Sequence, residues 1–323
     1  MEMNDKANIQ KVWEKGFDTT DDVEFGYMQH AYVYLKYINL YIYQMRESMR
    51  KYLPPEMTGE HPPFDYGETV ETLVAMDVKH VNVNTRDMSK NGYHAKVMTH
   101  EDAQKVFKLK DDLRLTNLPK SIIPYEKARR IIFDCPDRIL LMNCSCRSTR
   151  GDKGCWPRDV CMLIGEPWVS WGLENMKENN PRVITQEEAL AIIKQQHEMG
   201  NVQSAFFKDA CGDRMYGFCN CCTCCCVALA AQNYTGSPMF ASSGYVRKVD
   251  LDKCVGCGIC AENCHFMACK VVDGKIKVNP KKCKGCGVCT EKCPNGVNTL
   301  VLDDPEVSAP LDLAVLAPEH LRD

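Results

Sequence analysis

The chain has 323 residues, enough for an ordinary core and, at about 100–200 residues per domain, for two or three domains. Forty basic residues against 43 acidic ones give a net charge of −3, which excludes the strongly basic surface typical of nucleic-acid-binding proteins. Its 21 cysteines are an odd number and cannot all pair as disulfides. The composition therefore favours metal binding, with a protein or small molecule as partner.

The N-terminal sequence MEMNDKANIQKVWEKGF has no basic segment followed by an apolar stretch. We therefore expect no secretory signal, a cytoplasmic location and a reducing compartment. Thiolate–iron sites are damaged by oxygen, so the cysteine content also suggests an anaerobic host.

Residues 25–43 are the strongest candidate for a membrane span, but His30, Lys36 and Asn39 interrupt them and they fall short of the ~20 apolar residues required. We expect no membrane span. Aromatic and aliphatic residues recur at spacings of three and four from Tyr27 to Met45, which predicts a helix with one aromatic face. That face is expected to pack in the core, or to form the surface of a homo-oligomer or a partner contact.

The expected fold class is α+β, in three parts. Residues 1–120 contain no cysteine and predict a mainly helical N-terminal region with short strands. Within this region, Thr99 has the form of a helix N-cap, because Glu101 and Asp102 follow it, and it predicts a helix from about residue 100 towards 110.

Residues 121–240 predict a Cys-rich α/β module. We expect a helix over residues 125–133 and a short buried strand over 138–142. A capping box then opens a helix over 185–199, which Gly200 ends, and a strand follows over 202–207. Cysteines come directly after both strands, so the module should present them on loops.

The third part, residues 241–323, contains an internal repeat. VDLDKCVGCGICAENC, beginning at Val249, returns 29 positions later as VNPKKCKGCGVCTEKC. Between the copies, Asp273-Gly274 separates two alternating runs and predicts a two-residue hairpin.

Each copy has the spacing C-x2-C-x2-C-x3-C, in which three thiolates wrap one iron–sulfur cube and the fourth reaches towards a second cube. We therefore expect two [4Fe–4S] clusters. One takes Cys254, Cys257, Cys260 and Cys293, and the other takes Cys283, Cys286, Cys289 and Cys264. Paired zinc sites are the alternative.

This double motif resembles the bacterial two-cluster ferredoxin family over roughly residues 244–303. The resemblance implies a ferredoxin-like fold with a C-terminal tail, and electron transfer. In one departure, His265 stands where the second motif has Pro294; it either tunes a nearby potential or is a surface residue.

Lysines are crowded around the second motif. They are either solvated residues without a role or a docking surface for an acidic redox partner: Lys281, Lys282, Lys284 and Lys292.

Ten more cysteines form two upstream groups. The first has the spacing C-x-C-x8-C-x5-C, and the second is a run of six in eight residues: Cys144, Cys146, Cys155 and Cys161, then Cys219, Cys221, Cys222, Cys224, Cys225 and Cys226. Adjacent side chains point in different directions, so the run can hardly serve one cube. We predict one or more additional iron–sulfur clusters, either two clusters or one larger cluster shared by both groups, with zinc and metal-free thiols as alternatives.

Residues near these groups complete the prediction. Arg147 and Arg150 can offset negative cluster charge or be ordinary surface arginines, whereas Cys135 and Cys269 are expected to be small buried hydrophobes. The order CxCR, CNCCxCCC and two-cluster ferredoxin resembles a group of uncharacterised iron–sulfur proteins of anaerobes, a resemblance that implies no particular activity.

The leading hypothesis is an electron-transfer protein or subunit that links its ferredoxin domain, the upstream clusters and a partner oxidoreductase. An alternative is a reductase with an unusual catalytic cluster in the middle module, and another is a cluster scaffold or maturation factor. For the reductase, acid–base or anion-binding groups could come from residues near the cysteines, although no catalytic residue is assigned: His197, Asp209, Asp213 and Arg214. Motifs for nucleotide binding or serine hydrolysis are absent from the sequence.

Overall fold

The computed structural model describes residues 25–83, 94–125, 129–208 and 211–322, and within these ranges the chain is an α+β protein organised around one eight-stranded sheet. The strand order is β2-β3-β4-β7-β6-β1-β8, with β5 pairing on β3. These strands are β1 (His94–Met98), β2 (Leu113–Leu115), β3 (Ile131–Asn143), β4 (Asp159–Glu166), β5 (Arg182–Ile184), β6 (Val202–Lys208), β7 (Arg214–Cys221) and β8 (Phe240–Ala241).

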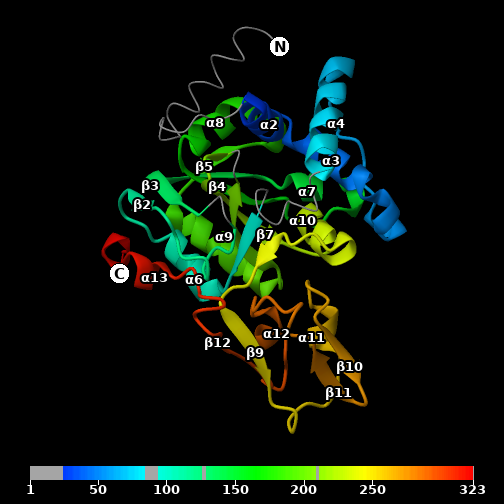
Figure 1. Cartoon of the computed structure of the whole chain (residues 1–323), viewed down its shortest axis with the longest axis vertical. Coiled ribbons are helices and arrows are strands. Elements are labelled where there is room, and N and C mark those ends of the chain that lie inside the picture. The colour runs from blue at the N-terminus through cyan, green and yellow to red at the C-terminus, as the bar shows by residue number, and fades with distance from the viewer. Residues whose placement is uncertain (1–24, 84–93, 126–128, 209–210, 323) are drawn as a thin grey trace.

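Helices cover both faces of this sheet (Figure 1). One layer shares a buried core with the sheet: α2 (Phe25–Lys36), α3 (Ile38–Ser48), α4 (Gly67–Val83), α8 (Trp168–Asn175) and α10 (Val227–Ala230). The opposite core is closed by α6 (His100–Val106), α9 (Gln186–Glu198) and α13 (Leu313–Leu316). Successive residues of β3 alternate between the two cores, Leu140 in the first and Ile139 and Leu141 in the second, so both faces are apolar.

The described remainder consists of short elements. They are α7 (Ser145–Ser148), α11 (Ile259–Glu262), α12 (Val288–Glu291), β9 (Tyr245–Val249), β10 (Cys269–Val272), β11 (Lys275–Val278), β12 (Asn298–Leu302), the 3-10 turns Arg50–Tyr52, Pro55–Met57, Gly151–Lys153, Lys177–Asn179 and Pro318–His320, and a π turn at Ala231–Thr235. No helix among the described residues is long and apolar enough to span a membrane.

The local signals for helices are confirmed. Thr99 and Thr185 each accept a hydrogen bond from the backbone N–H three residues on, at the start of α6 and α9. The predicted aromatic face is split between α2 and α3 at Tyr37, and its described members Tyr34 and Tyr41 are buried in the core.

Two predictions for the middle module are wrong. Residues 131–133 were expected in a helix, but they begin β3, because Ile131 and Phe133 are buried in one core and pair with β2; residues 126–128 lie outside the described ranges. The α/β expectation also fails in its topology, since β3–β4, β4–β7 and β6–β7 are all antiparallel. Successive cysteine-bearing segments therefore come to the same region of the sheet, although Cys161, Cys219 and Cys221 lie within β4 and β7 and not on loops as expected.

The expected boundary near residue 120 does not separate two sheets. β1 and β2 precede it, yet β1 pairs with β6 and β2 pairs with β3. The predicted mainly helical N-terminal region thus contributes strands to the same sheet as the Cys-rich module.

Residues 245–302, which we call the C-terminal lobe, form two antiparallel pairs, β9–β12 and β10–β11, with α11 and α12 beside them (Figure 1). The predicted hairpin is confirmed, because Asp273 and Gly274 have φ values of 53° and 70°, as its two-residue turn requires. The tail beyond the lobe returns to the main sheet, where Leu313 is buried and the Ala309 N–H donates to the Ser121 carbonyl at 2.8 Å.

Lys96 ties this tail to β1. Its side chain is 1% exposed, and its Nζ donates to the Ala309 carbonyl at 2.7 Å. Burial lowers the pKa of Lys96 to about 7, and the nearby Asp102 carboxylate only partly opposes that shift.

We predict that Lys96 makes stability rise with pH. The ordinary pKa is 10.5, so between about pH 7 and 10.5 the unfolded chain binds a proton that the folded chain does not. The Tm of the wild-type protein should therefore rise relative to that of Lys96→Met as pH increases from 7 to 10. The corresponding gain in the free energy of unfolding is about 1.4 kcal/mol per unit of pKa shift. Exposed Lys194→Met is the control; an equal pH slope in all three proteins would contradict the prediction.

Candidate metal centres

The eight motif cysteines of the C-terminal lobe line two separate cavities. One is lined by Cys254, Cys257, Cys260 and Cys293, and the other by Cys264, Cys283, Cys286 and Cys289. Each cavity therefore takes three cysteines from one motif and the fourth from the other, as the sequence predicts. Iron ligation by these groups stays a prediction, and their chemistry fits it, because four convergent thiols are the ligand set of a cube.

Glycine is required where the two loops approach other backbone. A Cβ on Gly256 would lie 2.2 Å from the Gly274 carbonyl oxygen, and one on Gly285 would lie 2.1 Å from that of Tyr245. Both glycines also have positive φ, 66° and 63°. The motif loops can therefore fold tightly around their cavities only with glycine at these positions.

Two residues near these cavities were not predicted. Arg247 donates to Cys260 Sγ at 3.3 Å and also lines the second cavity, so one cation contacts both sites. Cys269, expected to be a buried hydrophobe, is half-buried, lines the second cavity and donates to the Cys260 carbonyl at 3.4 Å. The same expectation is wrong for Cys135, which is exposed, at a φ of 54°.

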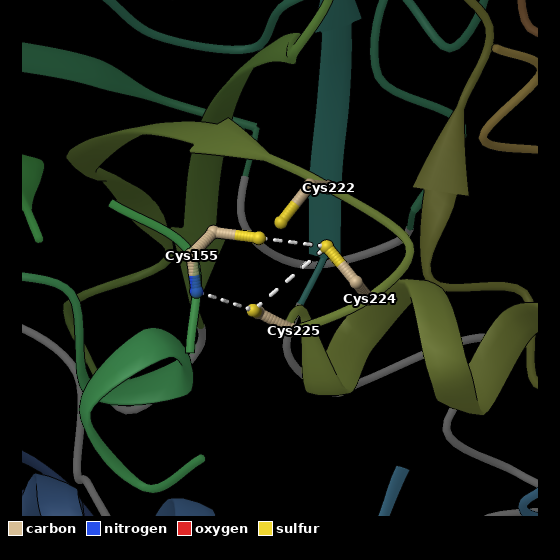
Figure 2. Close-up of side chains that lie close together, drawn as sticks. All are labelled: Cys155, Cys222, Cys224 and Cys225. Carbon is tan, nitrogen blue, oxygen red and sulfur yellow. Dashed lines mark hydrogen bonds between the residues drawn. The ribbon is translucent and has the colours of Figure 1, made fainter. Parts of the chain in front are cut away.

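A four-cysteine site, Cys155, Cys222, Cys224 and Cys225, lies in the middle module (Figure 2). All four sulfurs lie within 4.8 Å of one another, with Cys155 Sγ 3.0 Å from Cys224 Sγ. Cys155 comes from the loop before β4 and the others from the loop between β7 and α10.

Two thiols of the four-cysteine site have lowered pKa values, and their thiolate forms would attract a cation. Hydrogen bonding from Cys222 is the main reason that the pKa of Cys155 falls to about 6, and it also lowers the pKa of Cys225. The backbone N–H of Cys155 donates to Cys225 Sγ at 3.4 Å, which stabilises a thiolate there. Two sulfurs of the site are thus prepared to bind metal.

The other six upstream cysteines form a closed circuit that we call the six-cysteine ring. All six line one cavity, and each thiol shifts the pKa of two others, in the order Cys144, Cys146, Cys226, Cys221, Cys219, Cys161 and back to Cys144. Contact with Cys146 and burial raise the pKa of Cys144 to about 12. The pKa values of the other ring thiols are raised in the same way, so a metal bound at the ring would have to displace their protons.

The cysteine run after β7 divides its side chains between these two sites. Cys221 belongs to the ring and the adjacent Cys222 to the four-cysteine site, and Cys225 and Cys226 are divided in the same way. Cys222 and Cys225 also line the cavity that the ring encloses. The two sites therefore lie side by side, as expected if the run serves more than one centre.

Buried arginines connect the loops that carry these cysteines. Arg46, from α3, donates to the carbonyls of Cys225 at 2.7 Å and Cys146 at 3.3 Å. Arg147, 1% exposed, lines the ring cavity and donates to the Asn220 carbonyl at 3.2 Å, so the charge-offsetting role predicted for it fits its place. Arg150 instead donates to the carbonyls of Glu56 and Thr58, which ties the cysteine loop to the N-terminal helices.

A larger cavity of about 960 Å³ adjoins the ring. Cys146 and Cys226 line both cavities. Tyr34 and the buried Lys208 also line the larger one, with the Lys208 ammonium 4.6 Å from the Tyr34 ring centre. One edge of the ring therefore lies beside a volume that could admit a small molecule.

His265 joins the C-terminal lobe to the four-cysteine site. Its Nδ1 accepts from the Thr223 backbone N–H at 3.1 Å and lies 2.6 Å from the Thr223 hydroxyl. Because an amide N–H only donates, Nε2 carries the ring proton and donates to the Gly200 carbonyl at 2.7 Å. Of the two interpretations from sequence, the surface residue is wrong.

The residues considered for acid–base chemistry lie elsewhere or are not described. The imidazole ring of His197 stacks on that of His100 with 4.3 Å between the ring centres, and the Arg214 guanidinium lies 5.0 Å from the Trp168 ring centre. The Asp213 carbonyl accepts from the Arg130 N–H, and Asp209 lies outside the described residues. The contacts of His197 and Arg214 are compatible with the structural roles that were the alternative to catalysis, and catalytic roles for the four residues stay untested.

Comparison with known families supports the assignment of the C-terminal lobe. The family described as 4Fe-4S binding domain matches residues 247–268 and 276–297, one match for each copy of the repeat. No similar protein was found among curated proteins, and no similar structure among solved ones. The chain therefore carries a C-terminal ferredoxin-type 4Fe–4S domain and, with the clustered upstream cysteines, is an iron–sulfur protein suited to electron transfer.

Proposed function

We propose that this protein carries electrons between a redox partner, two [4Fe–4S] clusters in the C-terminal lobe and iron–sulfur centres in the middle module. The observation that carries the proposal is the His265–Thr223 contact. His265 follows Cys264, a ligand expected for the second lobe cluster, and Thr223 stands between Cys222 and Cys224 of the four-cysteine site.

This contact gives a short covalent and hydrogen-bonded connection between two metal sites. Electron tunnelling weakens steeply with distance and is favoured through bonds over empty gaps, so the imidazole provides a direct connection. Clusters bound at the two sites would supply one-electron redox chemistry. Packing of Phe266 on Phe240 holds this part of the lobe in place, and Asn233 donates to the His265 backbone carbonyl at 2.8 Å without contacting the imidazole path.

The variant His265→Pro tests the connection. Proline occupies the same place in the second motif, so the lobe should still fold and bind its clusters while the imidazole contact is lost. After rapid photoreduction of the lobe, we predict that electrons reach the middle module at least about tenfold more slowly, equivalent to about 1.4 kcal/mol in activation free energy. Freeze-quench EPR measures this rate.

Asn233→Ala is the matched control, because it removes a contact to the His265 backbone and keeps the imidazole in place. It should retain most of the wild-type rate. A wild-type rate in His265→Pro, with the lobe still docked, would reject the proposed connection.

We further propose that an acidic redox protein docks on the lobe at Lys281 and Lys282. Both lysines are exposed beside the second motif. The two other lysines considered from sequence are less suitable, because Lys284 is half-buried and Lys292 donates to the Glu198 carbonyl at 2.6 Å.

Salt dependence tests this docking surface. Electron transfer from an acidic ferredoxin should slow as ionic strength rises to ~0.15 M, because exposed charges are screened beyond about 8 Å. The double variant K281Q/K282Q should be slower at low salt and less salt-dependent, whereas Lys253→Gln, an exposed lysine near the first motif, should behave like the wild type. An unchanged salt slope in K281Q/K282Q would remove these lysines from the docking surface.

A reductase is the second candidate, and the cavity of about 960 Å³ beside Cys146 and Cys226 favours it. A centre at the ring would lie within reach of a small molecule there, and Lys208 would favour an anionic one. Cyanide is a probe of suitable size and charge. If the centre has an accessible iron, cyanide added to the reduced protein should change the Mössbauer signals of the ring irons. These are identified as the irons that are absent when the ring cysteines Cys161 and Cys219 are both replaced by alanine. An unchanged spectrum would reject the reductase.

A further inference from the structure

The six-cysteine ring has more thiols than one cube requires and fewer than two. A cube is held by four thiolates, the number of motif cysteines that line each cavity of the C-terminal lobe. In the ring no pair of thiols stands apart, because all six line the same cavity, with the Cys161 and Cys219 sulfurs 3.9 Å from each other. The set therefore has no evident division into four ligands and two spare cysteines.

Three different elements place the ring thiols around one cavity. Cys144 precedes α7, Cys161 lies on β4, and Cys219 and Cys221 lie on β7. Antiparallel pairing of β4 with β7 fixes the Cys161 and Cys219 sulfurs 3.9 Å apart. Three of the six thiols, Cys161, Cys219 and Cys221, are thus held on paired strands, which makes that side of the site rigid.

The surroundings suit a buried anionic centre. Apolar side chains such as Met142, Leu163 and Phe206 line the cavity, and the Arg147 guanidinium is the buried cation among its lining residues. Six thiolates in such a place would be strongly unfavourable without metal. Thiolate ligands favour iron–sulfur clusters or zinc, but a single zinc takes four ligands, two fewer than the ring offers.

We propose that the six-cysteine ring is a metal site of its own and holds one iron–sulfur cluster with more than four irons. The four-cysteine site beside it holds a separate cube. The shared run supplies both, since Cys221 and Cys226 belong to the ring, while Cys222 and Cys225, which also line the ring cavity, complete the four-cysteine site.

Iron counts in matched double variants test the proposal. The full-length chain is reconstituted without oxygen as wild type, as C161A/C219A in the ring and as C155A/C224A in the four-cysteine site. C155A/C224A should lose about four irons. C161A/C219A should lose more than four, with matching inorganic sulfide, while both keep the about eight irons of the lobe.

The outcomes separate the possibilities. Loss of about four irons from C161A/C219A would mean an ordinary cube in the ring, and no loss would mean a metal-free ring; either overturns the proposal. Zinc in place of the missing iron also overturns it. Loss of all upstream iron from both variants, with far-UV circular dichroism unchanged, would mean one cluster shared by ten cysteines and equally contradict it.

A milder variant guards against misfolding. Cys161→Ser keeps an oxygen ligand, so the ring irons should remain bound while their Mössbauer signals change. The signals of the irons in the four-cysteine site, identified as those lost in C155A/C224A, should stay the same. A change in the latter signals would contradict separate sites. The lobe clusters serve as an internal standard throughout, so failure of the ring proposal would leave the electron-transfer proposal intact.

Discussion

Successive side chains in an extended chain point to opposite sides, and the upstream metal sites depend on this constraint. The run that follows β7 cannot direct adjacent thiols to one point, so Cys221 and Cys222 divide between the ring and the four-cysteine site. Pairing of β7 with β6 fixes which side each thiol takes, since a shift of one residue would exchange the sides. Two sites that share a peptide backbone must lie next to each other, whatever they bind.

The N-terminal helices belong to this arrangement through one buried charge. Arg46 is fully buried, and its guanidinium donates to the carbonyls of Met57, Cys146 and Cys225. These carbonyls accept from its terminal nitrogens, but its Nε has no hydrogen-bond partner among the described residues, and a buried cation also needs nearby negative charge to offset desolvation. Thiolates on these loops are placed to supply that charge. Metal loading, which converts thiols to thiolates, should therefore strengthen the packing of α3 on the cysteine loops.

Local signals in the sequence predicted the parts that local chemistry controls. The cap at Thr185, the stop at Gly200 and the Asp273-Gly274 turn each depend on a few neighbouring residues. The start of β3 was missed because burial and pairing with β2 outweigh the helical pattern there. His265 could be seen as a departure from the repeat, but its partner Thr223 is 42 residues away, and only the fold brings them together. The same limit applies to the ring. The sequence identified its six cysteines, but their spatial order around the cavity depends on the fold.

The contacts order the sites in one direction. His265 leads from the C-terminal lobe to Thr223 within the four-cysteine site, and Cys222 and Cys225 of that site line the ring cavity. Cys146 and Cys226 on the ring then line the larger cavity. The lobe lies at one end of this series and a space for a small molecule at the other. Electron carrier and reductase are therefore variations of one arrangement, and they differ in whether a substrate enters the cavity beside Lys208.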